Sequence, residues 1–321
     1  MKISVAMCTY NGEVFLEQQI DSILNQTMKV NEIVVCDDGS NDRTHLILEK
    51  YSLKFPNLFR IYKNEINLRS VKNFEKAISL CTGDYIFLSD QDDIWVNIKV
   101  NDYVTYFKQN IRIDVIASNG FCIDDDGKVK EKYAIWDVPE FLKERNINFK
   151  YYELILMVAN IATGASMAFR KSVIQKILPI PIINGFHHDE WIAIISSIKN
   201  SFTLLNEKYF YYRIHSNQQL GGVFYNKTPK VKKELINNFD LNEKCYHFKD
   251  YKRRLKKLCY WYEKNKYLTK IETDKTDFFV ILNEIENNYY NCKKIMSSKY
   301  PIKSFLLNKI DGYTHKRQLK N

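Results

Sequence analysis

Three clusters of polar residues in the first third of the chain carry side chains that could bind a nucleotide, a phosphate or a metal ion. They are Thr9-Tyr10-Asn11-Gly12, Asp37-Asp38-Gly39-Ser40 and Ser89-Asp90-Gln91-Asp92-Asp93. Each cluster directly follows a short apolar run that is typical of a buried strand. Because ligands of open α/β sheets bind beyond the carboxyl ends of the strands, we expect the three clusters to form one binding site.

Asp90 and Asp92 have the spacing of a metal-ion site. Side chains at i and i+2 of an extended segment point to the same side, so both carboxylates could face one cation. Mg²⁺ or Mn²⁺ held by few protein ligands keeps positions free for substrate phosphate oxygens. The alternative is a solvated acidic turn. The context favours the metal, since the first predicted helix lacks a glycine-rich phosphate loop and bound phosphates would need another counter-charge.

The elements that must position these clusters follow from the alternation of β-rich apolar runs with helical periodicity. The pattern predicts strands over residues 2–8, 32–36, 58–62, 84–89, 114–118, 166–170 and 202–213, and helices over residues 13–26, 42–53, 71–81, 97–108 and 190–198. Such alternation builds a mostly parallel sheet flanked by helices. The predicted fold class is therefore α/β and Rossmann-like.

The charge of the chain is concentrated in its last third. Residues 221–321 hold 23 Lys/Arg and 11 Asp/Glu, a net charge of +12, whereas residues 1–220 hold 25 and 27, a net charge of −2. From about Tyr225 the sequence becomes rich in Lys, Asn and Tyr with helical spacing. We therefore expect two domains, a nearly neutral one over residues 1–220 and a basic helical appendage over residues 221–321.

The composition excludes several classes of protein. With 45% hydrophobic and 27% charged residues, the chain is globular. It has no apolar run of about 18 residues that would predict a membrane span. Its 7 cysteines are scattered without a CxxC pair, which argues against a zinc site or a disulfide framework. The N-terminal apolar run is too short for a signal peptide, so we expect a cytoplasmic location.

The first long helix predicted in the appendage has an apolar stripe flanked by basic residues. The stripe consists of Tyr251, Leu255, Leu258 and Tyr262, and residues 252–254, 256 and 257 are all Lys or Arg. Such a helix could lie on the anionic inner face of the cell membrane, or it could be a packed helix with a solvated basic face. A role in homodimerisation stays open. Nucleic acid is not an expected partner, since no known binding motif is present.

Together, the runs MKISVAMCTYNG, EIVVCDDGSNDRT and GDYIFLSDQDDIW resemble family 2 glycosyltransferases of the GT-A fold. The form SDQDDIW is similar to the bacterial rhamnosyltransferase-like branch. The resemblance covers residues 1 to about 220. It implies that Thr9, Tyr10 and Asn11 of the first cluster help to hold the nucleotide.

The resemblance also implies roles in the second and third clusters. Asp38 would contact the base and ribose, Asp90 would face the ribose and phosphates, and Asp92 would be the direct metal ligand. Asp37 could be structural instead of binding nucleotide. At Arg69, members of this branch often have Gly; the arginine could reach the diphosphate or be a surface charge.

Further downstream, the resemblance implies an acceptor side of the site. Gly164 would border the sugar pocket. Asp189, at the start of a predicted helix, would be the general base, with Glu190 as the alternate. The neighbouring histidines also allow a metal cluster, but adjacent helical residues diverge in direction and rarely share one ion.

Three other segments could complete the site. His215 could be a metal ligand or a hydrogen-bonded loop histidine. Arg213 could pair with a phosphate through its planar guanidinium. Trp95 and Trp191 could offer aromatic faces to an acceptor sugar or could be core residues.

These features predict an inverting, metal-dependent hexosyltransferase. It would move a sugar from a UDP- or dTDP-sugar to a hydroxyl of a saccharide or lipid-linked saccharide, as in bacterial cell-surface polysaccharide synthesis. Two alternatives stay open at this point. One is a phosphatase-like hydrolase with Asp90 as its nucleophile. The other is a non-catalytic scaffold that has kept the fold.

Overall fold

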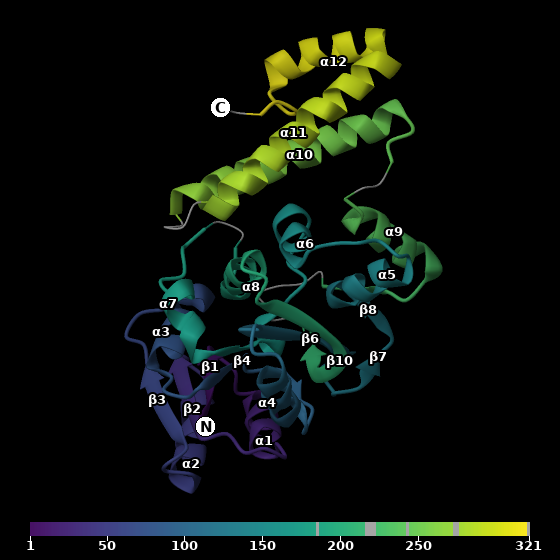
Figure 1. Ribbon diagram of the computed structural model, residues 1–321. Helices are drawn as coiled ribbons and strands as arrows, with labels where there is room; N and C mark the ends of the chain where they lie inside the picture. The colour runs from purple at the N-terminus through teal and green to yellow at the C-terminus, as the bar shows by residue number, and fades with distance from the viewer. Residues whose placement is uncertain (184–185, 216–222, 242–243, 272–275, 320–321) are drawn as a thin grey trace. The chain divides into compact units, whose positions relative to one another are not determined.

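The computed structural model describes residues 1–183, 186–215, 223–241, 244–271 and 276–319 (Figure 1). Its strands are β1 Ile3–Thr9, β2 Glu32–Asp37, β3 Phe59–Lys63, β4 Tyr85–Ser89, β5 Ile94–Trp95, β6 Val115–Ile123, β7 Val129–Lys130, β8 Lys132–Ala134, β9 Ala168–Arg170, β10 Phe202–Arg213 and β11 Phe224–Asn226. The longer helices are α1 Leu16–Leu24, α2 Thr44–Lys54, α3 Arg69–Leu80, α4 Lys99–Gln109, α5 Val138–Glu144, α6 Tyr151–Met157, α8 His188–Ile198, α9 Pro229–Phe239, α10 Phe248–Ile271, α11 Thr276–Lys299 and α12 Pro301–Thr314. Short helical turns lie at η1 Ile135–Asp137, η2 Gly164–Ser166, η3 Lys171–Val173 and α7 Ile174–Ile177.

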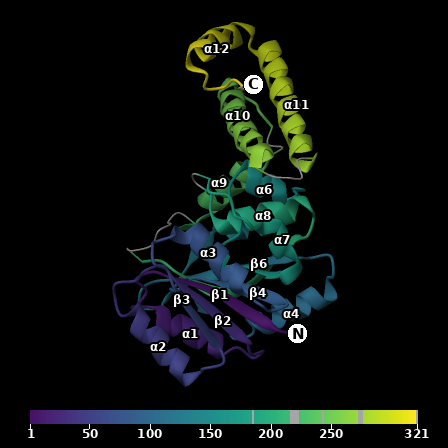
Figure 2. The ribbon, with the colours of Figure 1, turned by 90° about the vertical axis from the view of Figure 1, so that its left-hand side faces the viewer.

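The main sheet is mixed, with the strand order β3-β2-β1-β4-β9-β6-β10-β5 and β7 paired to β6. Strands β1 to β4 are parallel, as are β6 and β10, whereas β9 runs antiparallel to both β4 and β6. Helices flank the sheet, and α3 and α8 pack together on one side of it (Figure 2). This arrangement confirms the predicted α/β class. Strands β6 and β7 form a hairpin around a turn in which Gly127 has φ +79°.

The parallel strands explain why the three polar clusters meet. The central strands are apolar and buried on both faces, as expected for strands covered by helices. Strands β1, β2 and β4 share one direction, so the residues that follow Thr9, Asp37 and Ser89 emerge at the same edge of the sheet. The antiparallel strand β9 then brings the turn η2 beside β4 and β6.

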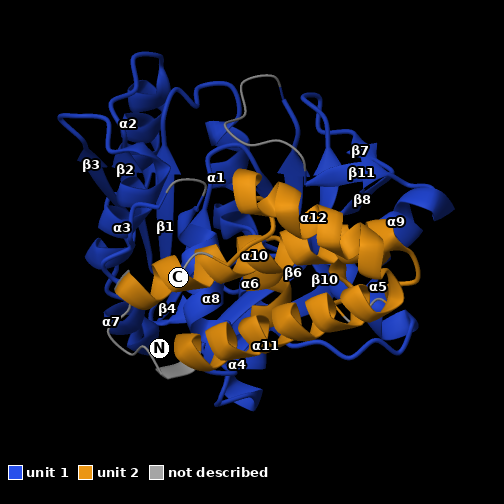
Figure 3. Cartoon of the chain, turned by 90° about the horizontal axis from the view of Figure 1, so that it is seen from above, with its two compact units in different colours: residues 1–151, 160–236 blue, residues 152–159, 237–321 orange. Residues whose placement is uncertain are grey.

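The chain divides into two compact units (Figure 3). The first comprises residues 1–151 and 160–236, and it contains the main sheet. The second comprises residues 152–159 and 237–321, and it is helical. The predicted boundary at residue 220 lies between residues 216 and 222, outside the described residues.

Apolar stripes on α10 and α11 form the core of the second unit, and the stripe of α10 is the one predicted from the sequence. Tyr251, Leu255 and Leu258 of α10 are buried, and α10 packs along α11. The corresponding stripe of α11, made of Phe278, Leu282, Ile285 and Tyr289, is buried as well. In the helices that the structure describes, no segment is both long enough and apolar enough to span a membrane.

Candidate active site

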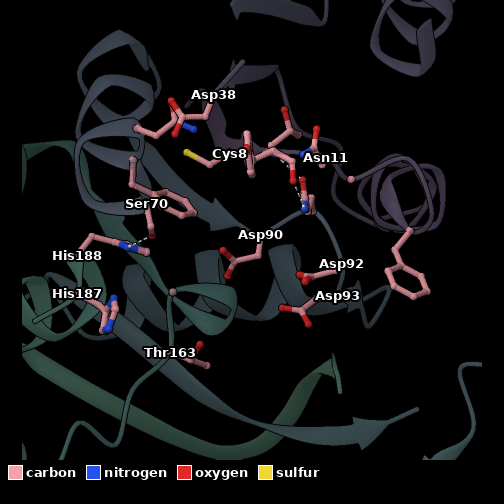
Figure 4. Close-up of a pocket in the computed structure, with 18 of the residues that line it drawn as sticks. Cys8, Asn11, Asp38, Ser70, Asp90, Asp92, Asp93, Thr163, His187 and His188 are labelled. Carbon is pink, nitrogen blue, oxygen red and sulfur yellow. Dashed lines mark hydrogen bonds between the residues drawn. The ribbon is translucent and has the colours of Figure 1, made fainter. Parts of the chain in front are cut away.

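A cavity of about 530 Å³ opens at the edge of the sheet where the three polar clusters meet (Figure 4). Its lining includes Thr9, Tyr10, Asn11, Asp38, Asp90, Asp92, Gly164, Asp189 and His215. These residues come from six separate segments of the chain. The structure thus brings together nine of the residues singled out in the sequence.

The first two clusters are joined by a network around Asp37. Its carboxylate accepts hydrogen bonds from the Thr9 hydroxyl at 2.8 Å, the Ser40 hydroxyl at 2.5 Å and the Ser40 backbone N–H at 3.1 Å. The Ser40 hydroxyl oxygen in turn accepts the backbone N–H of Asn11 at 2.9 Å. Asp37 is buried and, in the part of the chain that the structure describes, does not line the cavity of this site. Its contacts fit the structural role considered for it.

Asp38 closes the cavity toward helix α3. One of its carboxylate oxygens accepts hydrogen bonds from the Asn64 side-chain amide and the Leu68 backbone N–H, both at 2.7 Å. The other accepts the Arg69 backbone N–H at 2.8 Å. The carboxylate therefore satisfies free N–H groups at the start of α3, where negative charge is favourable. A carboxylate has about four acceptor positions, so three bonds leave capacity for a ligand.

Gln91 locks the third cluster onto the first. Its side-chain carbonyl accepts the Tyr10 backbone N–H at 2.7 Å, and its amide donates to the Tyr10 carbonyl at 3.0 Å. A Cβ atom on Gly12 would lie only 2.3 Å from the Gln91 Oε1 atom. Gly12 thus leaves room for the Gln91 side chain that joins these two loops.

Four of the carboxyl groups that line the cavity, those of Asp90, Asp92, Asp93 and Asp189, lie close enough for their charges to interact. Burial, together with the charges of Asp92 and Asp189, raises the pKa of Asp90 to about 8. Burial and the charges of Asp92 and Asp90 also raise the pKa of Asp93 well above its usual range. One Asp93 oxygen accepts the Arg213 backbone N–H at 3.1 Å, and the other has no partner among the described residues. A bound cation would reduce the electrostatic repulsion between these carboxyl groups and favour their ionised form.

A buried lysine beneath this cluster was not found from the sequence. Lys99 is fully buried at the start of α4, where its ammonium group donates to the Ala165 carbonyl at 2.7 Å. The ammonium also lies 4.0 Å from the centroid of the Trp95 ring. Burial lowers the pKa of Lys99 to about 7, and the charges of Asp93 and Asp90 oppose that shift. In the sequence, Lys99 looks like an ordinary polar residue of an amphipathic helix.

Asp92 and His215 supply neighbouring donor atoms for a metal ion. The His215 Nε2 atom lies 2.9 Å from Asp92 Oδ2, and both side chains line the cavity. A carboxylate and an imidazole are both common ligands of divalent transition metals. Within the described residues, no three His, Cys, Asp or Glu side chains already form a closed metal cluster. The donor set therefore fits an ion that completes its coordination with a ligand.

Asp189 lies at the start of α8 and is held by two backbone donors. Its Oδ2 atom accepts the Gly164 N–H at 3.0 Å, and its Oδ1 atom accepts the Glu190 N–H at 2.7 Å. Burial raises the pKa of Asp189 to about 6, against the opposing effects of the His187 charge and these two N–H groups. At neutral pH the group is mostly ionised and close to the pKa range of an effective base.

Two histidines beside Asp189 also line the cavity. The ring of His188 is buried and stacks on Phe74, with 3.8 Å between ring centroids. Burial lowers the pKa of His188 to about 3, so the ring is neutral. Its Nε2 atom has no partner among the described residues, and a Cβ atom on Gly164 would lie 2.6 Å from it. Gly164 thus leaves room for this histidine as well as binding Asp189.

Five residues singled out in the sequence do not line the cavity in the part of the chain that the structure describes: Arg69, Trp95, Glu190, Trp191 and Arg213. Arg69 is exposed at the first position of α3, in a left-handed conformation with φ +62°. Both tryptophans are buried, and Trp191 donates its indole N–H to the Ile177 carbonyl at 2.9 Å. Their positions fit the core role considered for them.

Arg213 is fully buried and holds loops together. Its guanidinium donates to the carbonyls of Asp92 at 2.9 Å and of Asp124 and Asp125 at 3.0 Å, and to the Gln18 side chain at 2.7 Å. It also lies 4.3 Å from the centroid of the Phe15 ring. The guanidinium thus donates its hydrogen bonds to groups of the protein itself, and it supports the Asp92 loop from the side away from the cavity.

Comparison with known proteins agrees with this geometry. Residues 4–178 match the model of the family described as glycosyl transferase family 2. A glucosyltransferase of Escherichia coli, named UDP-Glc:alpha-D-GlcNAc-diphosphoundecaprenol beta-1,3-glucosyltransferase WfaP, is 29% identical over 73% of this chain and 82% of its own length. An uncharacterized glycosyltransferase of Methanocaldococcus jannaschii is 27% identical over 74% of this chain and 77% of its own length.

Solved structures show the same fold. The structure of S. aureus TarS 1-349 in complex with UDP has a TM-score of 0.52 at 16% identity, covering 94% of this chain and 91% of that one. The mannosyltransferase PcManGT from Pyrobaculum calidifontis, in complex with GDP-Man and Mn²⁺, has a TM-score of 0.52 at 12% identity. The match covers 98% of this chain and 82% of that one. The fold is thus that of the GT-A glycosyltransferases, and because the family model matches more than half of the sequence, the chain belongs to glycosyl transferase family 2.

Proposed function

We propose that this glycosyltransferase is inverting and moves a sugar from a UDP- or dTDP-sugar to a hydroxyl group of a saccharide or lipid-linked saccharide. The observation that carries the proposal is the placement of Asp189 in the same cavity as Asp90, Asp92 and Asp38. One wall thus offers groups suited to a nucleotide diphosphate, and another offers a carboxylate suited to proton abstraction.

Asp189 acts as the general base in this proposal. Its carboxylate takes the proton of the acceptor hydroxyl while that oxygen forms a bond to the anomeric carbon of the donor sugar. The bond from that carbon to the phosphate oxygen breaks, and the leaving diphosphate keeps the electron pair. Attack from the side opposite the diphosphate inverts the configuration. The N–H groups of Gly164 and Glu190 hold the carboxylate in one orientation throughout.

The nucleotide lies against the first two clusters in this proposal. Tyr10 is partly exposed at the cavity wall, where its ring could stack on the base. The remaining acceptor capacity of Asp38 suits the N3–H of uracil or thymine. Asn11 is held by Ser40 and bonds the Asn41 N–H with its own side chain at 2.9 Å, so it shapes the loop beside the base.

Asp92 and His215 would hold Mg²⁺ or Mn²⁺, with Asp90 beside them. When bound, the ion supplies charge neutralisation for the departing diphosphate. The raised pKa of Asp90 fits this role, since its burial beside Asp92 favours a state in which a cation is present.

The relatives support the choice of substrates without settling it. The name of the E. coli relative specifies a UDP-linked donor and a lipid diphosphate acceptor. A similar acceptor would place this reaction at the inner face of a bacterial cell membrane, in the synthesis of a surface polysaccharide. His187, Ser70 and Thr163 also line the cavity, where they could contact the donor sugar.

Calorimetric titration with UDP and with dTDP, each with and without Mn²⁺, tests the donor side. We expect metal-dependent binding that Asp92→Ala abolishes. The control Asp114→Ala should leave binding intact, because Asp114 directly precedes β6, at the edge of the sheet opposite the cavity. Absence of binding to both nucleotides in the presence of Mn²⁺ would refute the proposed donor class. Stereochemistry is tested separately by NMR of the product formed with the donor that binds.

A further inference from the structure

Helix α12 presents an unusual distribution of side chains. Five large apolar side chains point outward: Ile302, Phe305, Leu306, Ile310 and Tyr313, which are 76%, 59%, 54%, 53% and 87% exposed. The buried positions of the same helix are Ser304, Leu307 and Asp311. A helix packed on a soluble domain ordinarily shows the reverse pattern, with its apolar stripe inward. The outer face of α12 therefore has the character of a contact surface.

The outward residues form one continuous stripe. Phe305, Leu306 and Tyr313 follow Ile302 by three, four and eleven positions. In a helix with 3.6 residues per turn, this spacing places them on the same side as Ile302. Lys309 lies within the stripe, with its ammonium 4.8 Å from the centroid of the Phe305 ring. Lys303 flanks it. The stripe thus combines aliphatic, aromatic and basic side chains.

The charge around the stripe is strongly positive. Residues 293–319 hold 7 Lys or Arg and a single acidic residue, Asp311. That carboxylate is buried and paired with Arg317, whose Nε atom lies 2.9 Å from Asp311 Oδ2. The exposed surface of this segment therefore offers cations beside apolar groups, which is the composition of helices that lie in the interface of an anionic bilayer.

The helix first suspected of this role is unsuited to it. The apolar stripe of α10 packs inside the second unit, where Tyr251, Leu255 and Leu258 are at most 4% exposed. Membrane contact through that stripe would require the unit to unfold. On α12 the stripe is already free of the protein core.

We propose that the outward face of α12 binds an anionic lipid bilayer, with Phe305 and Leu306 at the acyl-chain boundary and Lys303 and Lys309 at the headgroups. A second copy of the chain fits this face less well. In a two-fold symmetric contact, the same lysines would face each other across the interface and repel. A lipid phosphate instead attracts them, and long lysine side chains can extend past apolar groups to reach it.

Flotation of the full chain with lipid vesicles tests the proposal. We expect binding to vesicles that contain phosphatidylglycerol and at least tenfold weaker binding to pure phosphatidylcholine. The pair Phe305→Ser with Leu306→Ser, and separately Lys303→Glu with Lys309→Glu, should each weaken binding to phosphatidylglycerol at least tenfold. The matched control is Leu46→Ser with Leu53→Ser on α2, where both leucines are also exposed and binding should stay unchanged. Thermal unfolding confirms that each variant is folded.

A fluorescent variant provides a second readout. The emission of Phe305→Trp should shift to shorter wavelength on addition of phosphatidylglycerol vesicles. Equal vesicle binding by the Phe305/Leu306 variant and the parent chain would overturn the proposal. So would sedimentation that shows the parent chain as a dimer and this variant as a monomer. Both measurements omit nucleotide and acceptor, so their failure would leave the proposed sugar transfer untouched.

Discussion

The Gly164 backbone N–H and the Asp189 carboxylate are joined by a hydrogen bond of 3.0 Å that spans 25 positions of the sequence. This bond ties the turn η2, which precedes β9, to the first turn of α8. The carboxylate that we propose as the general base is thus oriented by the backbone of a segment that itself borders the cavity. A shift of η2 would move the carboxylate relative to the acceptor.

Replacing the proposed base Asp189 by a side chain of the same size should lower the rate of the chemical step without weakening donor binding. Asp189→Asn keeps the side-chain shape but cannot accept the acceptor proton, so kcat should fall by about 10²- to 10⁴-fold. The UDP affinity should stay within about twofold, because the Asp189 carboxylate bonds the N–H groups of Gly164 and Glu190 and makes no hydrogen bond to the nucleotide clusters within the described residues. Glu190→Gln is the matched control, since Glu190 does not line the cavity within the described residues, and its kcat should stay near that of the parent. If Glu190→Gln instead lost most of its kcat and Asp189→Asn kept its kcat, Glu190 and not Asp189 would be the general base.

The pH dependence of turnover follows from the raised pKa of Asp189, which is about 6. The base must be ionised to accept a proton, so activity requires a pH above that value. We expect kcat to be level above about pH 7 and to fall about tenfold per pH unit well below pH 6. Initial rates between pH 4.5 and 8 at saturating donor check this. An acidic limb that persists unchanged in the residual activity of Asp189→Asn would assign the titration to another group.

Much of this site could be predicted from the sequence because parallel strands place the ends of β1, β2 and β4 at one edge. The same reasoning failed to place Arg213, whose partners are carbonyls of loops distant in the sequence. Local spacing carries no information about such contacts. The stripe of α12 was likewise missed, because only the packing of the second unit shows which side of that helix is left exposed.

Adding a methyl group to Gly164 should destabilise the protein through His188. The new Cβ atom would lie 2.6 Å from His188 Nε2, and the ring of His188 is buried and stacked on Phe74. We expect Gly164→Ala to lower the free energy of unfolding by about 1–3 kcal/mol. Gly312→Ala is the control, since a Cβ atom there meets nothing within 4 Å.

The cause of that loss can be isolated with a double variant. If the clash with His188 is responsible, the double variant Gly164→Ala/His188→Ala should lose less free energy of unfolding than the two single variants lose in total. Urea unfolding of all four proteins measures this coupling. Additive losses, within about 0.5 kcal/mol, would show that the strain lies elsewhere.

Removing the guanidinium of Arg213 should weaken both the fold and the metal site. Arg213→Met keeps much of the apolar stem but leaves the carbonyls of Asp92, Asp124 and Asp125 without their donor. Because hydrogen bonds from charged groups contribute about 1.5–3 kcal/mol each, the free energy of unfolding should fall by about 3 kcal/mol or more. The Asp92 loop loses its support, so Mn²⁺-dependent UDP binding should also weaken in the fraction that stays folded.

The control for this change is an arginine whose ion pair is exposed. Arg43 donates to Glu13 at 3.0 Å with a side chain that is 78% exposed, and such pairs contribute little in water. Arg43→Met should therefore leave the urea midpoint and UDP affinity unchanged. If Arg213→Met unfolds at the same urea concentration as the parent, the guanidinium does not support the loop. If it is destabilised yet binds Mn²⁺ and UDP as tightly as the parent, then the buried arginine stabilises the fold without positioning Asp92.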